Sequence, residues 1–83
     1  MKSMQVDMKI DIEGLPVKKI TFERFNDDET LAEFRTRIIA KNMPDCYKDN
    51  YELYSFYYGN HPEILPDDTK LGQIETLSFL RLE

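Results

Sequence analysis

Residues 6–12 alternate strictly between apolar and charged side chains, and this pattern constrains the fold more than any other feature of the chain. The apolar members are Val6, Met8, Ile10 and Ile12. Alternate side chains of a β-strand point to opposite faces, so a period of two predicts a strand with one buried face. The chain therefore begins with a half-buried strand.

A second strand is predicted over residues 17–25, after a turn that contains a glycine and a proline. Alternation of apolar and polar residues resumes there, and the two segments read as a β-hairpin. Because Phe22 and Phe25 are three residues apart, placing both on one face requires an extra residue. We therefore expect a β-bulge near residues 23–24.

A helix of about eleven residues is predicted after the hairpin. Thr30 and Glu33 form the T-x-x-E pattern of a capping box, in which each side chain satisfies a free backbone N–H of the other residue. The apolar residues that recur at helical spacing are Leu31, Phe34 and Ile38. The basic residues expected on the helix surface are Arg35, Arg37 and Lys41. The helix is expected to stop near Lys41, because Pro44 prevents its continuation.

The second half of the chain predicts shorter elements. The aromatic-rich segment 51–58 reads as a third strand, 64–65 as a short fourth strand, 71–74 as a helical turn and 76–82 as a final strand. In the final strand, Leu77 and Phe79 are expected on one face and Leu80 and Leu82 on the other, where the latter two are either exposed for contact with a partner or packed on the third strand. The order predicts a single α+β domain over residues 1–83, with a mixed sheet of four to five strands (ββαββ) and one helix on one face. Residues 1–3 are either a flexible native start or an added remnant.

Composition narrows the classes of function. A chain of 83 residues with a net charge of -5 has room for one small core and not for an elaborate active-site cleft. One cysteine and one histidine cannot supply a disulfide framework or a four-ligand zinc site, so no cofactor or metal is expected. No apolar run is long enough for a membrane span or a signal peptide, and no basic cluster is suited to nucleic acid. We expect a monomer of the cytoplasm or nucleus.

The residues that could in principle act in catalysis or bind a metal ion have simpler structural interpretations. His61 precedes a proline in a turn with no partner for a catalytic triad, and Cys46 lies in a polar loop as an incidental thiol. The acidic runs 27–29 and 67–68 lack the spacing of a calcium loop and are typical of turns and helix caps. The chain is therefore not expected to be an enzyme.

With these elements in order, the sequence resembles the ubiquitin-like domains. The residues that carry the resemblance are Met4, Gln5 and Val6, then Asp28–Leu31 with Phe34 and Ile38, Met43 and Pro44, Leu53, Gly59, Thr76, Leu77, Phe79 and Leu80. The resemblance implies a ubiquitin-like β-grasp fold. Conjugated members and sulfur carriers activate a C-terminal Gly-Gly, whereas this chain ends at Leu82-Glu83. As written it is therefore expected to act as a non-covalent protein-docking module.

The resemblance also implies a partner-binding patch on the exposed sheet face. Its centre falls on Tyr54, its last-strand member on Leu80 and its hairpin member near Leu15. The rim positions that are basic in ubiquitin fall on Glu52, Asn60 and Ser78. Ordinary ubiquitin receptors should therefore bind this chain poorly.

Other interpretations remain open at this point. The aromatic residues of 51–58 are either an exposed binding platform or strand and core residues. Lys18, Lys19 and Arg24 on the second strand suggest a Ras-binding type of domain that contacts an acidic small GTPase. The domain would otherwise be a regulatory or targeting segment of a ubiquitin-pathway enzyme or proteasome shuttle, or a structural piece of a splicing or chaperone assembly.

Overall fold

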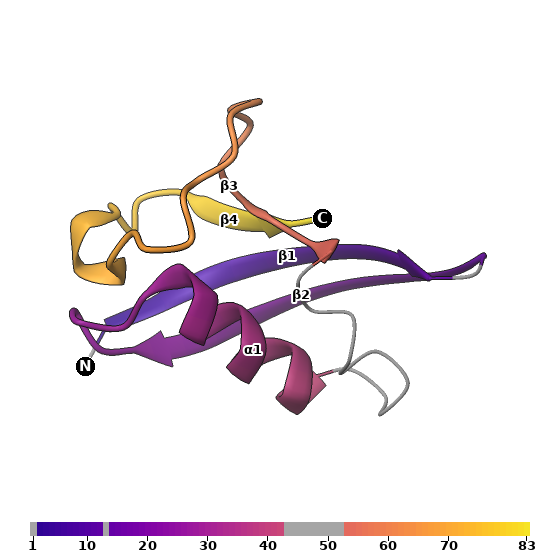
Figure 1. Cartoon of the computed structure of the whole chain (residues 1–83), viewed down its shortest axis with the longest axis horizontal. Coiled ribbons are helices and arrows are strands. Elements are labelled where there is room, and N and C mark those ends of the chain that lie inside the picture. The colour runs from indigo at the N-terminus through magenta and orange to yellow at the C-terminus, as the bar shows by residue number, and fades with distance from the viewer. Residues whose placement is uncertain (1, 13, 43–52) are drawn as a thin grey trace.

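A computed structural model describes residues 2–12, 14–42 and 53–83 of the chain. Its elements are β1 (Lys2–Ile12), β2 (Leu15–Phe25), α1 (Leu31–Asn42), β3 (Phe56–Tyr58), the 3-10 helix η2 (Leu71–Gln73) and β4 (Phe79–Leu82). The strands form one sheet in the order β2-β1-β4-β3, in which β1 and β4 are parallel and the other pairs are antiparallel. The helix α1 crosses one face of this sheet (Figure 1). A mixed sheet with one helix confirms the α+β class and is compatible with a β-grasp fold.

The second half of the chain is less regular than its sequence predicted. The third strand is only three residues long, and Ile64 forms an isolated bridge with Tyr57 instead of a separate strand. Within the aromatic segment, Tyr54 and Phe56 are buried, whereas Tyr57 and Tyr58 are half-buried. Cys46 and the first residues of the predicted strand lie outside the described residues.

The hairpin of β1 and β2 pairs without interruption. Its ladder runs from Lys2 opposite Phe25 to Ile12 opposite Leu15, and Gly14 takes a φ of 79° in the turn. The predicted β-bulge is therefore wrong. Phe25 is buried, but Phe22 is 71% exposed on the other face.

The helix begins as predicted. The Glu33 backbone N–H donates to the Thr30 hydroxyl, and the Thr30 N–H donates to the Glu33 carboxylate, both at 3.3 Å. This confirms the capping box. Leu31, Phe34 and Ile38 are buried, as their spacing indicated. Arg35, which was expected on the surface, is buried as well.

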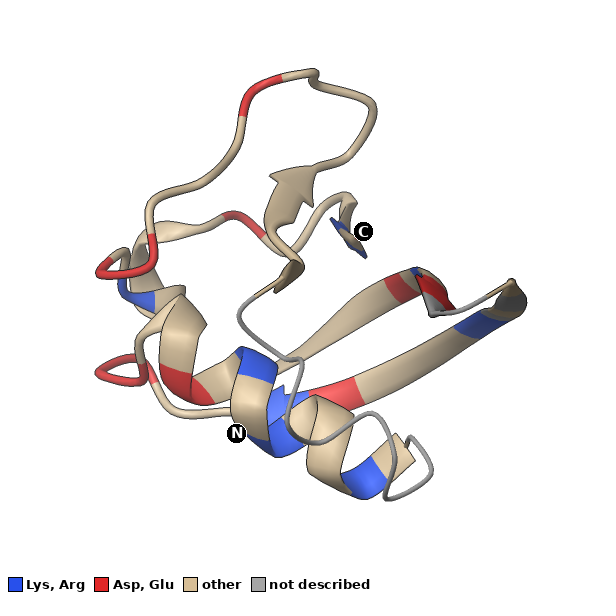
Figure 2. Ribbon diagram, turned by 45° about the vertical axis from the view of Figure 1, so that its right-hand side comes forward, with Lys and Arg blue, Asp and Glu red and all other residues tan. Residues whose placement is uncertain are grey.

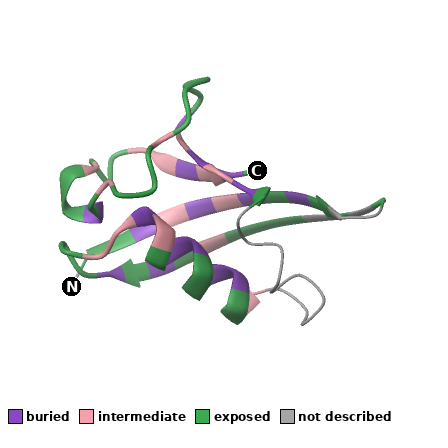
Figure 3. Ribbon diagram, viewed as in Figure 1, coloured by how far each residue is buried: buried purple, intermediate pink, exposed green. Residues whose placement is uncertain are grey.

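The core lies between α1 and one face of the sheet (Figure 3). Phe34 is at its centre, with its ring stacked at 5.8 Å on Phe56 and edge-on at 6.3 Å to Phe25. The β1 residues that share this face are Met4, Val6, Met8 and Ile10, all buried. The alternation in β1 is therefore confirmed.

The two faces of β4 are reversed from those that the predicted patch requires. Leu80 and Leu82 are fully buried, whereas Leu77 is 91% exposed and Phe79 is half-buried. Parallel pairing with β1 explains the reversal, because it sets Leu80 beside Val6 and Leu82 beside Met8. Partners across a sheet share a face, so these leucines join the core.

Candidate functional site

The structure does not bring the predicted patch residues together on a surface. Tyr54 and Leu80 are buried in the core, so the exposed positions predicted for them are wrong. Leu15 begins β2, but its side chain lies outside the described part of the chain, as does the whole of Glu52. Ser78 is half-buried just before β4. For Leu80 the error is one step of register, because adjacent strand residues face opposite sides, whereas Tyr54 lies before β3 and outside the strands.

A different set of side chains occupies the sheet face opposite α1, here called the outer sheet face. It consists of Ser3, Gln5, Asp7, Lys9 and Asp11 of β1, Lys18, Ile20, Phe22 and Arg24 of β2, Tyr57 of β3, and Phe79 and Arg81 of β4. Strand pairing sets Phe22 beside Gln5, and Ile20 beside Asp7. Ile20 and Phe22 are 63% and 71% exposed. Two large apolar side chains therefore lie next to each other on the edge strand.

Arg81 of β4 lies between β1 and β3 on the outer sheet face. Its guanidinium lies 4.8 Å from the centre of the Tyr57 ring and donates to the His61 carbonyl at 2.9 Å. Gln5 donates to Asp7 at 2.9 Å nearby.

The outer sheet face is more basic than the chain as a whole. Its charged side chains are Lys9, Lys18, Arg24 and Arg81 against Asp7 and Asp11, and Arg81 also lies 3.8 Å from the Glu83 carboxylate, in a chain whose net charge is -5. Many acidic residues lie instead in loops at the opposite end from the hairpin tip (Figure 2). Two of these loops meet there, since the Lys70 ammonium lies 3.9 Å from Asp28.

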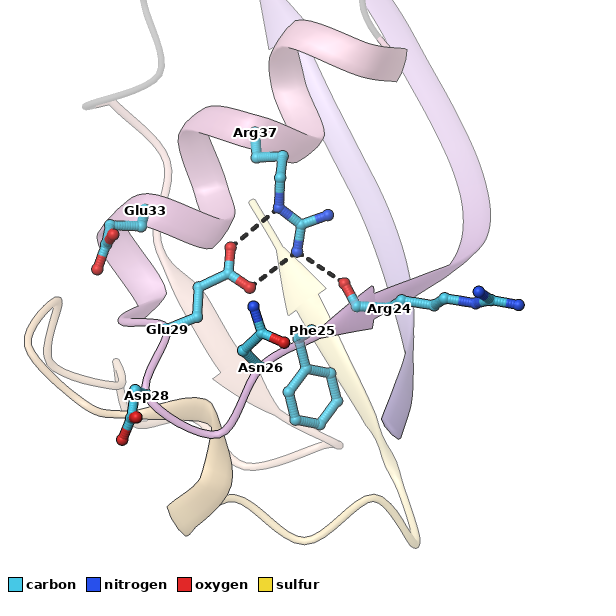
Figure 4. Close-up of a pocket in the computed structure, with 7 residues that line it drawn as sticks. All are labelled: Arg24, Phe25, Asn26, Asp28, Glu29, Glu33 and Arg37. Carbon is cyan, nitrogen blue, oxygen red and sulfur yellow. Dashed lines mark hydrogen bonds and ion pairs between the residues drawn. The ribbon is translucent and has the colours of Figure 1, made fainter. Parts of the chain in front are cut away.

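A hollow of about 560 Å³ lies where β2 leads into α1 (Figure 4). The Arg37 guanidinium donates two hydrogen bonds of 2.9 Å to the Glu29 carboxylate and one of 2.7 Å to the Arg24 carbonyl. The Arg24 side chain itself points away from the hollow (Figure 4). Glu33 belongs to the capping box. The charged groups that line the hollow therefore serve mainly to join the strand to the helix.

The other arginine of the helix, Arg35, is buried, unlike Arg37. Arg35 donates to both carboxylate oxygens of Asp67, at 2.9 and 3.1 Å, and to the Tyr54 carbonyl at 3.0 Å. It thus joins α1 to the segment before β3 and to the loop before η2. Sequence periodicity alone missed this residue, because a partner 32 positions away satisfies its charge.

Glu23 is the buried acid of β2. Its carboxylate accepts hydrogen bonds from Lys41 at 3.0 Å, Asn42 at 3.1 Å and Thr21 at 2.9 Å. Burial by itself raises the pKa of the Glu23 carboxyl, but the three hydrogen bonds and the charge of Lys41 outweigh it and bring the pKa below its ordinary value. Since Glu23 takes the inward position, Phe22 must point outward.

Acidification is expected to destabilise the fold partly through Glu23. A carboxyl whose pKa is lower in the folded state contributes stability above its unfolded pKa, about 4.3, and this contribution is lost as the pH falls through the folded value. Urea unfolding of the wild type between pH 7 and pH 2.5 should show this loss. The E23Q variant should be less stable by about 1–2 kcal/mol at pH 7 and should lack that part of the pH dependence.

Glu75 offers a control for this measurement, because it is exposed and has no ion pair or hydrogen bond with any residue that the structure describes. The E75Q variant is expected to follow the wild-type pH profile. If E23Q were to follow it too, the three hydrogen bonds would not favour the charged carboxylate.

The described residues contain no group of three His, Cys, Asp or Glu side chains that could hold a metal ion. None of the helices described is long and apolar enough to cross a membrane. His61 lies in an exposed turn, where its N–H donates to the Tyr58 carbonyl at 3.0 Å.

Comparison of the chain with protein family models, with curated proteins and with solved structures finds no match. The candidate site therefore depends on the geometry of the outer sheet face. Sequence reasoning missed Ile20 and Phe22 because it invoked a bulge. Their spacing of two residues places Ile20 and Phe22 on one face of a strand, but it does not indicate which face is exposed.

Proposed function

We propose that this chain is a non-catalytic, ubiquitin-like β-grasp domain that docks a protein partner through its outer sheet face. The observation that carries the proposal is the exposure of Ile20 and Phe22 side by side on the edge strand β2. Adjacent exposed apolar side chains favour a binding role, and an aromatic residue is a common energetic anchor of interfaces.

Charge indicates the kind of partner. Lys18 and Arg24 lie on the same face of β2 as the apolar pair, one at each end of it. A second copy of β2, paired antiparallel about residue 21, would set Lys18 opposite Arg24, and like charges directly opposite destabilise a sheet. An acidic partner surface with an apolar centre is complementary instead.

A small-GTPase-binding domain is the second candidate. Lys18, Lys19 and Arg24 are all exposed on the edge strand. Asp7 and Asp11 lie on the same sheet face as Lys18 and Arg24 and offset part of their charge, but Glu23 of β2 points inward and is paired with Lys41. This removes one objection to an acidic GTPase as the partner.

The docking proposal is tested by a double substitution of the apolar pair. The I20S/F22S variant should bind each direct partner with an affinity at least tenfold lower than that of the wild type. Truncating an interface anchor costs more than about 1.4 kcal/mol of binding free energy. Partners would be captured from cells on the wild type and on the variant, quantified by mass spectrometry, and the direct ones confirmed with purified proteins. Both substitutions are at exposed positions, so the fold should be retained.

The matched control is L77S, which removes an exposed apolar side chain that lies outside the outer sheet face. Wild-type binding by L77S together with loss in I20S/F22S supports the proposal, and equal partner sets for all three proteins refute it. The K18E/K19E/R24E variant separates the two candidates. Loss of binding to purified, GTP-loaded small GTPases in this variant favours the second, whereas absence of GTPase binding by the wild type eliminates it.

A further inference from the structure

A second hollow, of about 340 Å³, lies beside Tyr58. It is lined by Tyr58, His61, Glu63, Leu65, Gln73, Ile74 and Glu75, and we call it the Tyr58 hollow. Tyr58 follows Tyr57 in β3 and so faces the opposite side of the sheet. The Tyr58 hollow is therefore separate from the outer sheet face.

The floor of the Tyr58 hollow is apolar. Tyr58, Leu65 and Ile74 are half-buried and pack against the core. The His61 ring lies 6.0 Å from that of Tyr58, at an interplanar angle of 32°. Together these side chains offer an apolar and aromatic surface to a ligand.

Backbone hydrogen bonds hold the walls of the Tyr58 hollow in place. The Leu65 N–H donates to the Phe56 carbonyl at 2.8 Å, which ties one wall to β3. The Ile74 N–H donates to the Leu71 carbonyl at 3.1 Å and ends η2. A site with fixed walls loses little conformational freedom when a ligand binds.

Two carboxylates, of Glu63 and Glu75, complete the lining. Both residues are exposed, and among the described residues neither has an ion pair or a hydrogen bond. None of the described residues that line the hollow is a lysine or an arginine. Other acids of the fold, such as Glu23, Glu29 and Asp67, are paired with basic side chains. The hollow thus combines an apolar floor with uncompensated negative charge.

We propose that the Tyr58 hollow binds an arginine side chain presented by a partner peptide segment. The methylene stem of arginine would pack on Leu65 and Ile74, because long basic side chains cover apolar surface while the charged group stays near water. The guanidinium would stack on Tyr58 and pair with Glu63 and Glu75. Arginine suits this site better than lysine, since its planar group can do both.

The experiment is a titration of the isotopically labelled 83-residue chain with the peptide acetyl-Gly-Leu-Arg-Leu-Gly-amide, followed by NMR. Amide signals of residues 58–61, 63–65 and 73–75 should shift with saturation. The same peptide with glutamine in place of arginine should bind about tenfold more weakly, as expected when a charge-assisted interaction is lost. Equal binding of the two peptides, or shifts elsewhere on the chain, would overturn the proposal.

Matched variants locate the charge effect. The E63Q/E75Q variant should bind the arginine peptide about three- to tenfold more weakly than the wild type does. D11N/D68N changes the net charge by the same amount at exposed acids outside the hollow, and it should bind as the wild type does. If both double variants lowered the peptide affinity equally, the effect would come from net charge alone, and the proposed site would be refuted.

The inference stands apart from the docking proposal. I20S/F22S, which alters the outer sheet face, should bind the arginine peptide with wild-type affinity. Loss of peptide binding in that variant would place the peptide on the outer sheet face and refute the Tyr58 hollow. Self-association through the hollow, seen as concentration-dependent shifts without peptide, would also contradict it.

Discussion

Replacing Leu80 by alanine is expected to lower the free energy of unfolding by about 3 kcal/mol, whereas L77A should change it by less than about 0.5 kcal/mol. The two leucines are three positions apart at the end of the chain, and the substitution removes the same atoms from each. Leu80 is fully buried beside Val6, but Leu77 is 91% exposed. Only the first substitution leaves a cavity in the core.

Urea unfolding followed by circular dichroism measures both changes. A small domain has a total stability of roughly 5–15 kcal/mol, so the loss in L80A would be a large part of it. The comparison tests which face of β4 is buried. A larger loss in L77A than in L80A would indicate that the opposite face of this segment is buried, and similar losses would contradict the selective burial of Leu80.

The second large effect is expected at Arg35. Its side chain is 5% exposed, and it gives two hydrogen bonds to Asp67 and one to the Tyr54 carbonyl. R35A removes these bonds, leaves the buried carbonyl without this donor and opens space beside the core. We expect a loss of about 2–3 kcal/mol in the free energy of unfolding. The loss is limited because the side chain of Asp67 is 61% exposed and stays solvated.

Arg37 provides the matched control for this measurement. It makes the same two-bond contact with Glu29 from the same helix, but its own side chain is 42% exposed. R37A should cost about 1 kcal/mol or less, because solvent compensates for the lost contact. R35M keeps the apolar stem and should be more stable than R35A. Equal losses in R35A and R37A would show that burial adds nothing to the Arg35 contact.

Local sequence determined the hairpin strands and the start and buried stripe of the helix. The alternation over residues 6–12 and the capping box of Thr30 and Glu33 each depend on residues that are close in sequence. Local interactions are therefore sufficient to specify the strand and the start of the helix. The candidate site was less predictable. Its cations Lys18 and Arg24 were recognised from the sequence as a binding surface, but the apolar residues between them were not.

Tertiary structure alone decided which faces of β2 and β4 are buried. A period of two is equally compatible with either face, and a shift of one residue reverses both. In β2 the choice depends on Glu23, which can point inward because Lys41 and Asn42 lie 18 and 19 positions away in sequence but within hydrogen-bonding distance in space. In β4 it depends on the parallel pairing with β1. The apolar pair Ile20 and Phe22 is therefore exposed for a reason that no local pattern contains.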